Sequence, residues 1–225
     1  MAATVRDRTA LIEVNVDIGT GGTSLLAARL GFWSAIVFAL MTVVFDIGAA
    51  FGAAGAPVGA WPAAAAFAVA PAFLILIVAL HLQSETRLQA WSLIALSFAI
   101  VYAAIVALNY GLQVSVVRRF PAAYSLLTLE LQPQSAFWAL EAVGYTFMSA
   151  AALLLAPLLR SSASGRVVGW IFVANAVGDV LGAAAYLATG DPAHPFAILS
   201  LAIWGVGFPF AGVLLAFDFR RRLPG

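Results

Sequence analysis

Long runs of apolar residues dominate the chain, and short polar or Gly/Pro-rich segments separate them. An α-helix needs about 20 predominantly apolar residues to cross the hydrocarbon core of a bilayer. Six stretches meet this requirement: residues 30–51, 62–82, 88–112, 136–158, 167–188 and 195–217. The pattern therefore predicts an all-α polytopic membrane protein with a bundle of six transmembrane helices. Residues 25–219 form the predicted membrane domain, between an N-terminal tail (1–24) and a basic C-terminus (220–225).

The composition supports a lipid-facing exterior. Hydrophobic residues make up 64% of the chain and charged residues only 9%, whereas a soluble domain carries about 25% charged residues. The absence of cysteine excludes disulfides and thiolate metal sites, and the absence of lysine excludes Schiff-base chemistry. Arginine as the sole basic residue type besides histidine, together with abundant alanine, favours a GC-rich bacterial source. We therefore expect an inner-membrane protein, and we expect the tail not to be a signal peptide.

The arginines predict the orientation of the helices. Cytoplasmic segments of membrane proteins are enriched in basic residues. If the N-terminus lies inside, nine arginines fall on the cytoplasmic side and two fall outside. The outer pair is Arg118 and Arg119, and the inner set is Arg6, Arg8, Arg29, Arg87, Arg160, Arg166, Arg220, Arg221 and Arg222. This bias predicts an N-in, C-in topology.

The longest break between spans, residues 118–134, contains a helical pattern of its own. Phe120, Tyr124, Leu127 and Leu131 recur at helical spacing, and Pro121 suits the first turn of a helix. This pattern predicts a short amphipathic helix on the outer surface, between spans three and four. An ordinary ordered loop and a lid over an outward opening are the two interpretations of its role.

Polar side chains inside the predicted spans provide the candidate ligand-binding site. Several are four residues apart and therefore share a helix face. At about 1.5 Å rise per residue, Asp46 and Glu141 lie about 8 Å outward of their span centres, and Asn109 lies about 13 Å outward. Asp179 lies near the middle of its span. The full candidate set is Asp46, Asn109, Gln113, Glu141, Tyr145, Asn175 and Asp179.

Carboxyl groups at this depth need a physical explanation, because a charge inside the bilayer costs several kcal/mol (about 2.5 or more). The predicted layer holds three carboxyl groups and no arginine. Such groups are either protonated or surround a cation, a basic ligand or water. For two pairs of these residues, a role other than ligand binding remains open. Asn175 and Asp179 flank the small-residue face Ala174–Gly178–Gly182 and could pair helices, whereas Asn109 and Gln113 could be hydrated near the interface.

Other residues suggest no further chemistry. His81 and His194 are predicted on opposite sides of the membrane, so we expect no metal site, and no cofactor motif or catalytic set is recognisable. We expect Trp204, near the middle of the last span, to contribute packing. Gly205, Gly207 and Pro209 predict a kink or flexible point in that span.

Three functions compete on this basis. The first is binding or transport of a small cationic or proton-coupled solute through an outward-facing acidic cavity. The second is an intramembrane enzyme that acts on a lipid or isoprenoid-like substrate, with the Asp46 or Glu141 carboxyl group as general acid. The third is a non-catalytic membrane subunit or scaffold. The expected partners are the lipid bilayer, a small-molecule or lipid ligand and a second copy of the chain, and no nucleic acid.

Overall fold

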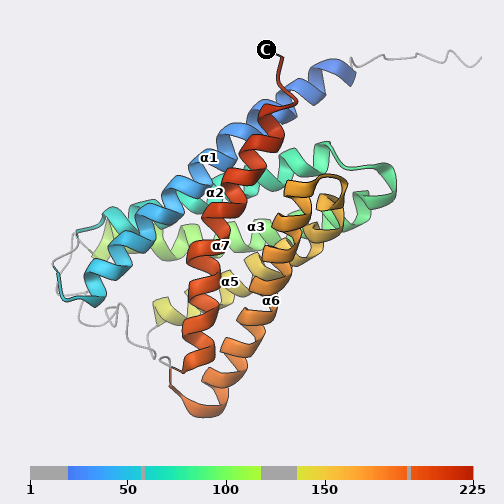
Figure 1. The fold of residues 1–225 in the computed structure, drawn as a ribbon. Coiled ribbons are helices and arrows are strands. Elements are labelled where there is room, and N and C mark those ends of the chain that lie inside the picture. Colours follow the sequence, from blue (N-terminus) through green and yellow to red (C-terminus); the bar gives the residue numbers. More distant parts are fainter. Residues whose placement is uncertain (1–19, 57–58, 118–135, 192–193, 225) are drawn as a thin grey trace, which may run out of the picture.

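A computed structural model describes residues 20–56, 59–117, 136–191 and 194–224. In these ranges the protein is all-helical, with six long helices (Figure 1). The long helices are α1 (Thr20–Ala53), α2 (Trp61–Leu82), α3 (Gln89–Leu112), α5 (Ala136–Leu155), α6 (Ala163–Thr189) and α7 (Pro195–Arg220). Short helical turns extend two of them: a 3-10 turn at Thr86–Leu88 precedes α3 and a π-helical turn at Gln113–Val117 follows it, and a 3-10 turn at Ala156–Ser161 follows α5.

All six helices are long and apolar enough to cross a membrane, which confirms the prediction of six long apolar helices as candidate spans. Their outward faces carry large apolar side chains that a water-exposed surface would not favour. Trp33, Trp170 and Val206 are 64%, 72% and 74% exposed, respectively. The chain is therefore a multi-pass membrane protein in contact with the lipid bilayer.

The helix ends differ from the sequence prediction mainly at α1, which begins at Thr20 rather than at residue 30. Leu25 to Ala28 are good helix formers, so the helix continues through the region of Arg29 instead of stopping there. The last five residues of the predicted tail are accordingly helical. α5 ends at Leu155, shortly before Pro157, and α6 begins after Ser162, whose hydroxyl accepts a hydrogen bond from the Gly165 N–H at 2.9 Å.

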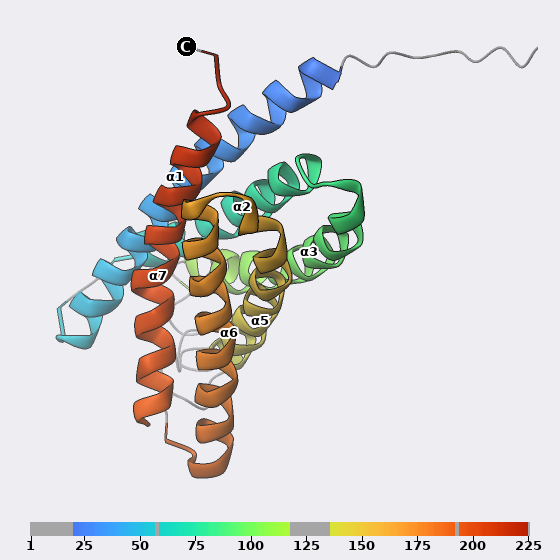
Figure 2. The ribbon, with the colours of Figure 1, turned by 45° about the vertical axis from the view of Figure 1, so that its right-hand side comes forward.

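The helices form a closed circuit in chain order. Each helix packs on the next, and α7 packs back on α1. Figures 1 and 2 show α6 and α7 running side by side, with α1 crossing α7. The crossing is close because Gly212 of α7 lies against α1. A Cβ atom there would come within 3.0 Å of the Ala35 carbonyl oxygen and 2.9 Å of the Ala39 Cβ.

Connections predicted on the cytoplasmic side lie together at one end of the bundle. Gln83 and Glu85 after α2, Ser161 and Ser162 before α6, and Arg222 after α7 surround one cavity there. Their proximity agrees with alternation of the spans. The predicted amphipathic segment 118–134 and the tail residues 1–19 lie outside the described residues.

Candidate functional site

Glu141 and Tyr110 join α5 to α3 at the candidate site. The Tyr110 hydroxyl donates a hydrogen bond of 2.6 Å to the Glu141 Oε1 atom. Tyr145, one turn further along α5, interacts electrostatically with both residues. The spacing of four residues places Glu141 and Tyr145 on one face of the helix, as the sequence predicted.

Asp46 approaches the same site from α1. Its carboxylate lies against the backbone of Gly205 in α7, where a Cβ atom would be 3.2 Å from both carboxylate oxygens. It also interacts electrostatically with Tyr145. The absence of a side chain at Gly205 therefore makes room for the Asp46 carboxylate between α1 and α7.

Aromatic rings pack on one another next to these two carboxyl groups. The Phe45 ring centroid lies 6.1 Å from that of Tyr110 and 5.8 Å from that of Trp204. The Tyr145 ring lies 4.9 Å from Trp204 and 6.0 Å from Tyr102. Most of these pairs meet edge to face, the arrangement that aromatic quadrupoles favour. We call this group the acidic aromatic cluster; it comprises Phe45, Asp46, Tyr102, Tyr110, Glu141, Tyr145 and Trp204.

Three buried polar atoms in or beside the cluster have no hydrogen-bond partner among the described residues: the Tyr102 hydroxyl, the Asn109 Nδ2 and the Trp204 Nε1. Tyr102 and Asn109 are fully buried, and Trp204 is only 8% exposed. Asn109 directly precedes Tyr110 on α3. The Asn109 Oδ1 accepts a hydrogen bond of 3.4 Å from the Gln113 Nε2, and the Gln113 side chain is half-buried. Asn109 is thus not hydrated at the interface, one of the alternatives that the sequence left open. Buried polar groups without partners are uncommon, so three in one region call for an explanation.

Asn175 and Asp179 form a separate pair between α6 and α5. The Asn175 Nδ2 donates a hydrogen bond of 2.8 Å to the Ser149 Oγ, and Asp179 interacts with the same hydroxyl. Gly178 and Gly182 lie nearby against Ser200 of α7. The two residues therefore pair helices, one of the alternatives that the sequence left open, and no hydrogen bond in the described chain links them to the cluster.

No basic side chain neutralises the carboxyl groups within the described ranges. The ion pair found there joins Arg87 to Glu85, and both of these side chains are highly exposed. No group of three potential metal ligands occurs among the described residues either. His81 instead hydrogen-bonds Ser92 through its Nδ1 at 2.8 Å, which links α2 to α3 at the end opposite His194.

Sequence reasoning included Tyr145 but missed the other aromatic residues of the cluster. Trp204 was expected to contribute packing alone, whereas its indole N–H lies buried without a partner next to Tyr145. Tyr102 and Tyr110 are eight residues apart and share one face of α3, which is a signal that the sequence contains. The contribution of Phe45 could not be found this way, because its partners lie on α3 and α7.

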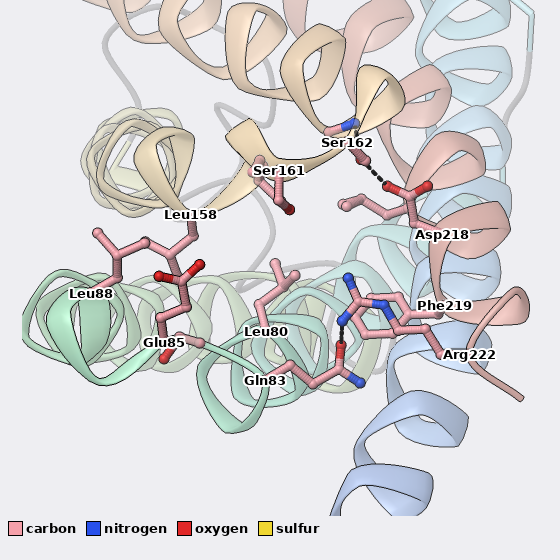
Figure 3. A pocket seen from close by; sticks show the side chains of 14 residues that line it. Leu80, Gln83, Glu85, Leu88, Leu158, Ser161, Ser162, Asp218, Phe219 and Arg222 are labelled. Atoms are coloured by element: carbon pink, nitrogen blue, oxygen red, sulfur yellow. Dashed lines mark hydrogen bonds between the residues drawn. The ribbon is translucent and has the colours of Figure 1, made fainter.

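A cavity of about 90 Å³ lies at the arginine-rich end of the bundle (Figure 3). The Asp218 carboxylate accepts hydrogen bonds from Ser162 at 2.9 Å and Ser164 at 2.5 Å, and Arg222 donates one to Gln83. These contacts connect the end of α7 to α6 and α2. The cavity contains no residue of the acidic aromatic cluster.

A second hollow is an apolar groove of about 770 Å³ between α1 and α7. Phe32, Leu40 and Phe210 are among the residues that line it, and Arg220 lies at one end. Neither Asp46 nor Glu141 borders the groove.

Comparisons with protein-family models, with curated proteins and with solved structures found no match to this chain.

Proposed function

We propose that this protein binds or transports a small cationic or proton-coupled solute, with the Asp46 and Glu141 carboxyl groups as its binding residues. The observation that carries the proposal is that two carboxyl groups, from α1 and α5, both interact with Tyr145 and have no basic partner among the described residues. A carboxylate in a low-dielectric interior is costly unless a proton or another cation compensates its charge. A cation or a transferable proton supplies that compensation.

The topology proposed with this function is N-in and C-in, in the inner membrane of a bacterium. In that orientation, Asp46 lies close to the outer end of α1 and Glu141 close to the outer end of α5. The site then opens outward, through a cavity that forms when the packed aromatic rings separate. The amphipathic segment between spans three and four would lie above it.

The two other functions have less support. An enzyme that acts on a lipid would need its substrate beside a carboxyl group, yet the apolar groove between α1 and α7 is not lined by Asp46 or Glu141. A scaffold role is favoured by the Asn175–Ser149 pair, which connects α6 to α5 one turn beyond Tyr145. We therefore retain both functions as the alternatives that a negative result of the following experiment would favour.

The proposal is tested with purified protein in proteoliposomes. Proton entry, sodium uptake and choline uptake are measured under an inside-negative membrane potential, and thermal stabilisation by sodium and choline is measured in parallel. We expect the wild type to move or bind at least one of the three. Glu141→Gln and Asp46→Asn should reduce that activity to the level of protein-free liposomes, because both substitutions remove the negative charge.

Glu85→Gln is the matched control, because Glu85 is an exposed carboxylate at the far end of the bundle and should leave activity unchanged. Circular dichroism and gel filtration establish that each variant folds. The proposal fails if folded Glu141→Gln and Asp46→Asn proteins match the wild type. It also fails if the wild type neither moves nor binds any of the three ions.

A further inference from the structure

We propose that the ligand of the acidic aromatic cluster is a small organic ammonium ion that also carries a hydrogen-bond acceptor, as an ammonium alcohol does. This inference rests on the proposed function and specifies its substrate class. Three features of the cluster support it: the carboxyl pair, the adjacent rings and the buried donors without partners.

The carboxyl pair requires a positive charge. Asp46 and Glu141 come from different helices and both interact electrostatically with Tyr145, so a cation beside that ring would be attracted by both. Glu141 already accepts a hydrogen bond from Tyr110, while the Asp46 oxygens lie against Gly205. A charge placed between α1 and α5 would therefore complete the electrostatics of the site.

The rings favour an organic cation over a hydrated metal ion. The rings of Phe45, Tyr110, Tyr145 and Trp204 pack on one another next to the carboxyl groups: Tyr110 hydrogen-bonds Glu141, and Asp46 lies against Gly205, the residue after Trp204. An alkylated ammonium is attracted to aromatic faces within about 6 Å and is weakly hydrated, so it exchanges water for rings at low cost. A divalent metal ion instead needs several oxygen ligands, and the described residues offer no group of three acidic or histidine side chains.

The unpartnered polar atoms require an acceptor on the ligand. The Trp204 indole N–H and the Asn109 amide N–H groups are donors only, and the Tyr102 hydroxyl can donate as well. A cation cannot accept their hydrogen bonds, whereas a hydroxyl, carbonyl or carboxylate oxygen can. A ligand with both an ammonium and an oxygen acceptor would thus satisfy the carboxyl groups and the buried donors together.

Entry of such a ligand requires the rings to separate, because they now contact one another. α7 is suited to this movement near Trp204. Gly205 follows Trp204 directly, and Gly207 lies two residues further on. Pro209 has no backbone N–H, so it cannot donate the hydrogen bond that its position in the helix would otherwise make. A bend there would move Trp204 relative to Phe45 and Tyr145.

Binding is measured by calorimetry on the full-length protein in lipid nanodiscs, with three probes of similar shape. Choline has both the charge and the acceptor, tetramethylammonium has the charge alone, and dimethylbutanol is the neutral carbon analogue of choline. We expect choline to bind best, tetramethylammonium more weakly, and the neutral alcohol at least about tenfold more weakly than choline.

Two substitutions at Trp204 separate the contributions of ring and N–H. Trp204→Phe retains an aromatic ring but removes one of the three unpartnered donors, so it should reduce the preference for choline over tetramethylammonium. Trp204→Leu should weaken the binding of both cations. Trp170→Phe is the matched control, because Trp170 is 72% exposed on the lipid-facing side of α6.

Two results would overturn the inference. One is equal binding of choline and its neutral analogue by the wild type. The other is a wild type that moves protons or sodium but binds no ammonium probe, a result that leaves the proposed function standing. Both are measured on the wild type, so the inference remains testable even if the Trp204 variants fail to fold.

Discussion

Two tyrosines on one face of α3 differ in what their hydroxyl groups contact. Tyr110 donates a hydrogen bond to Glu141, whereas the hydroxyl of Tyr102, two turns earlier, is buried without a partner. Both side chains are almost completely inaccessible, so burial alone does not distinguish them. The energetic role of each hydroxyl therefore depends on the presence of a partner rather than on depth.

At the scale of the residue, Tyr110→Phe should lower the free energy of unfolding by about 1–2 kcal/mol, because it leaves a half-buried carboxyl group without its donor. Tyr102→Phe should be neutral or stabilising in the ligand-free protein, because it removes a polar atom that has no partner. Denaturant-induced unfolding in bicelles measures both. Equal destabilisation by the two substitutions would contradict this assignment of the hydroxyl groups.

At the scale of the element, small residues determine how closely the helices approach. α1 and α7 are the first and last helices of the chain, and they pack together where Gly212 faces Ala35 and Ala39. Close approach of two backbones through small residues is a common means of helix association in membranes. This contact closes the circuit of six helices and brings Asp46 to Gly205 further along the same pair.

Gly212→Ala should destabilise the protein by about 1–3 kcal/mol, since its Cβ would overlap the Ala35 carbonyl and the Ala39 side chain. Gly111→Ala is the matched control. Its Cβ would lie 3.6 Å from Phe67, an ordinary contact, so the gain in helix propensity should make it neutral or stabilising by up to about 1 kcal/mol. Thermal unfolding of both variants tests the prediction. A Gly212→Ala protein as stable as the wild type would exclude a tight α1–α7 crossing.

At the scale of the whole molecule, the structure has two distinct ends. One end holds the polar contacts of Asp218 and Arg222 with α6 and α2, and the acidic aromatic cluster lies away from it. Arg87, Arg160 and the basic C-terminus belong to the same end as these contacts. Basic residues favour the cytoplasmic side, so the proposed topology places this end inside.

Single cysteines can test the orientation without background, because the natural chain contains none. Asp191→Cys, in the turn after α6, should react with a membrane-impermeant maleimide in intact cells. Glu85→Cys, at the opposite end, should react only after the cells are permeabilised. The wild type and Val206→Cys, on the lipid face, serve as unlabelled controls. The reversed pattern of labelling would show that the N-terminus lies outside.

The number and position of the spans were predictable from sequence, because helix formation in lipid depends on local hydrophobicity and length. The start of α1 was predicted ten residues too late, because the criterion of a continuous apolar run stopped at Arg29 and passed over the good helix formers Leu25 to Ala28. The polar side chains of the candidate site were likewise visible as exceptions within apolar runs. That Glu141 and Tyr145 share one face of α5 followed from their helical spacing alone.

Tertiary structure decided which of those side chains meet. Asp46, Glu141 and Tyr145 come together with rings from α3 and α7, while Asn175 and Asp179 turn to Ser149 instead. Depth in the membrane constrains only one coordinate, and the rotation of each helix about its axis depends on packing between helices that are distant in sequence. The sequence by itself therefore determined a six-helix membrane protein with buried acids. Only helix packing revealed that two of them share an aromatic site with unpartnered donors in and beside it.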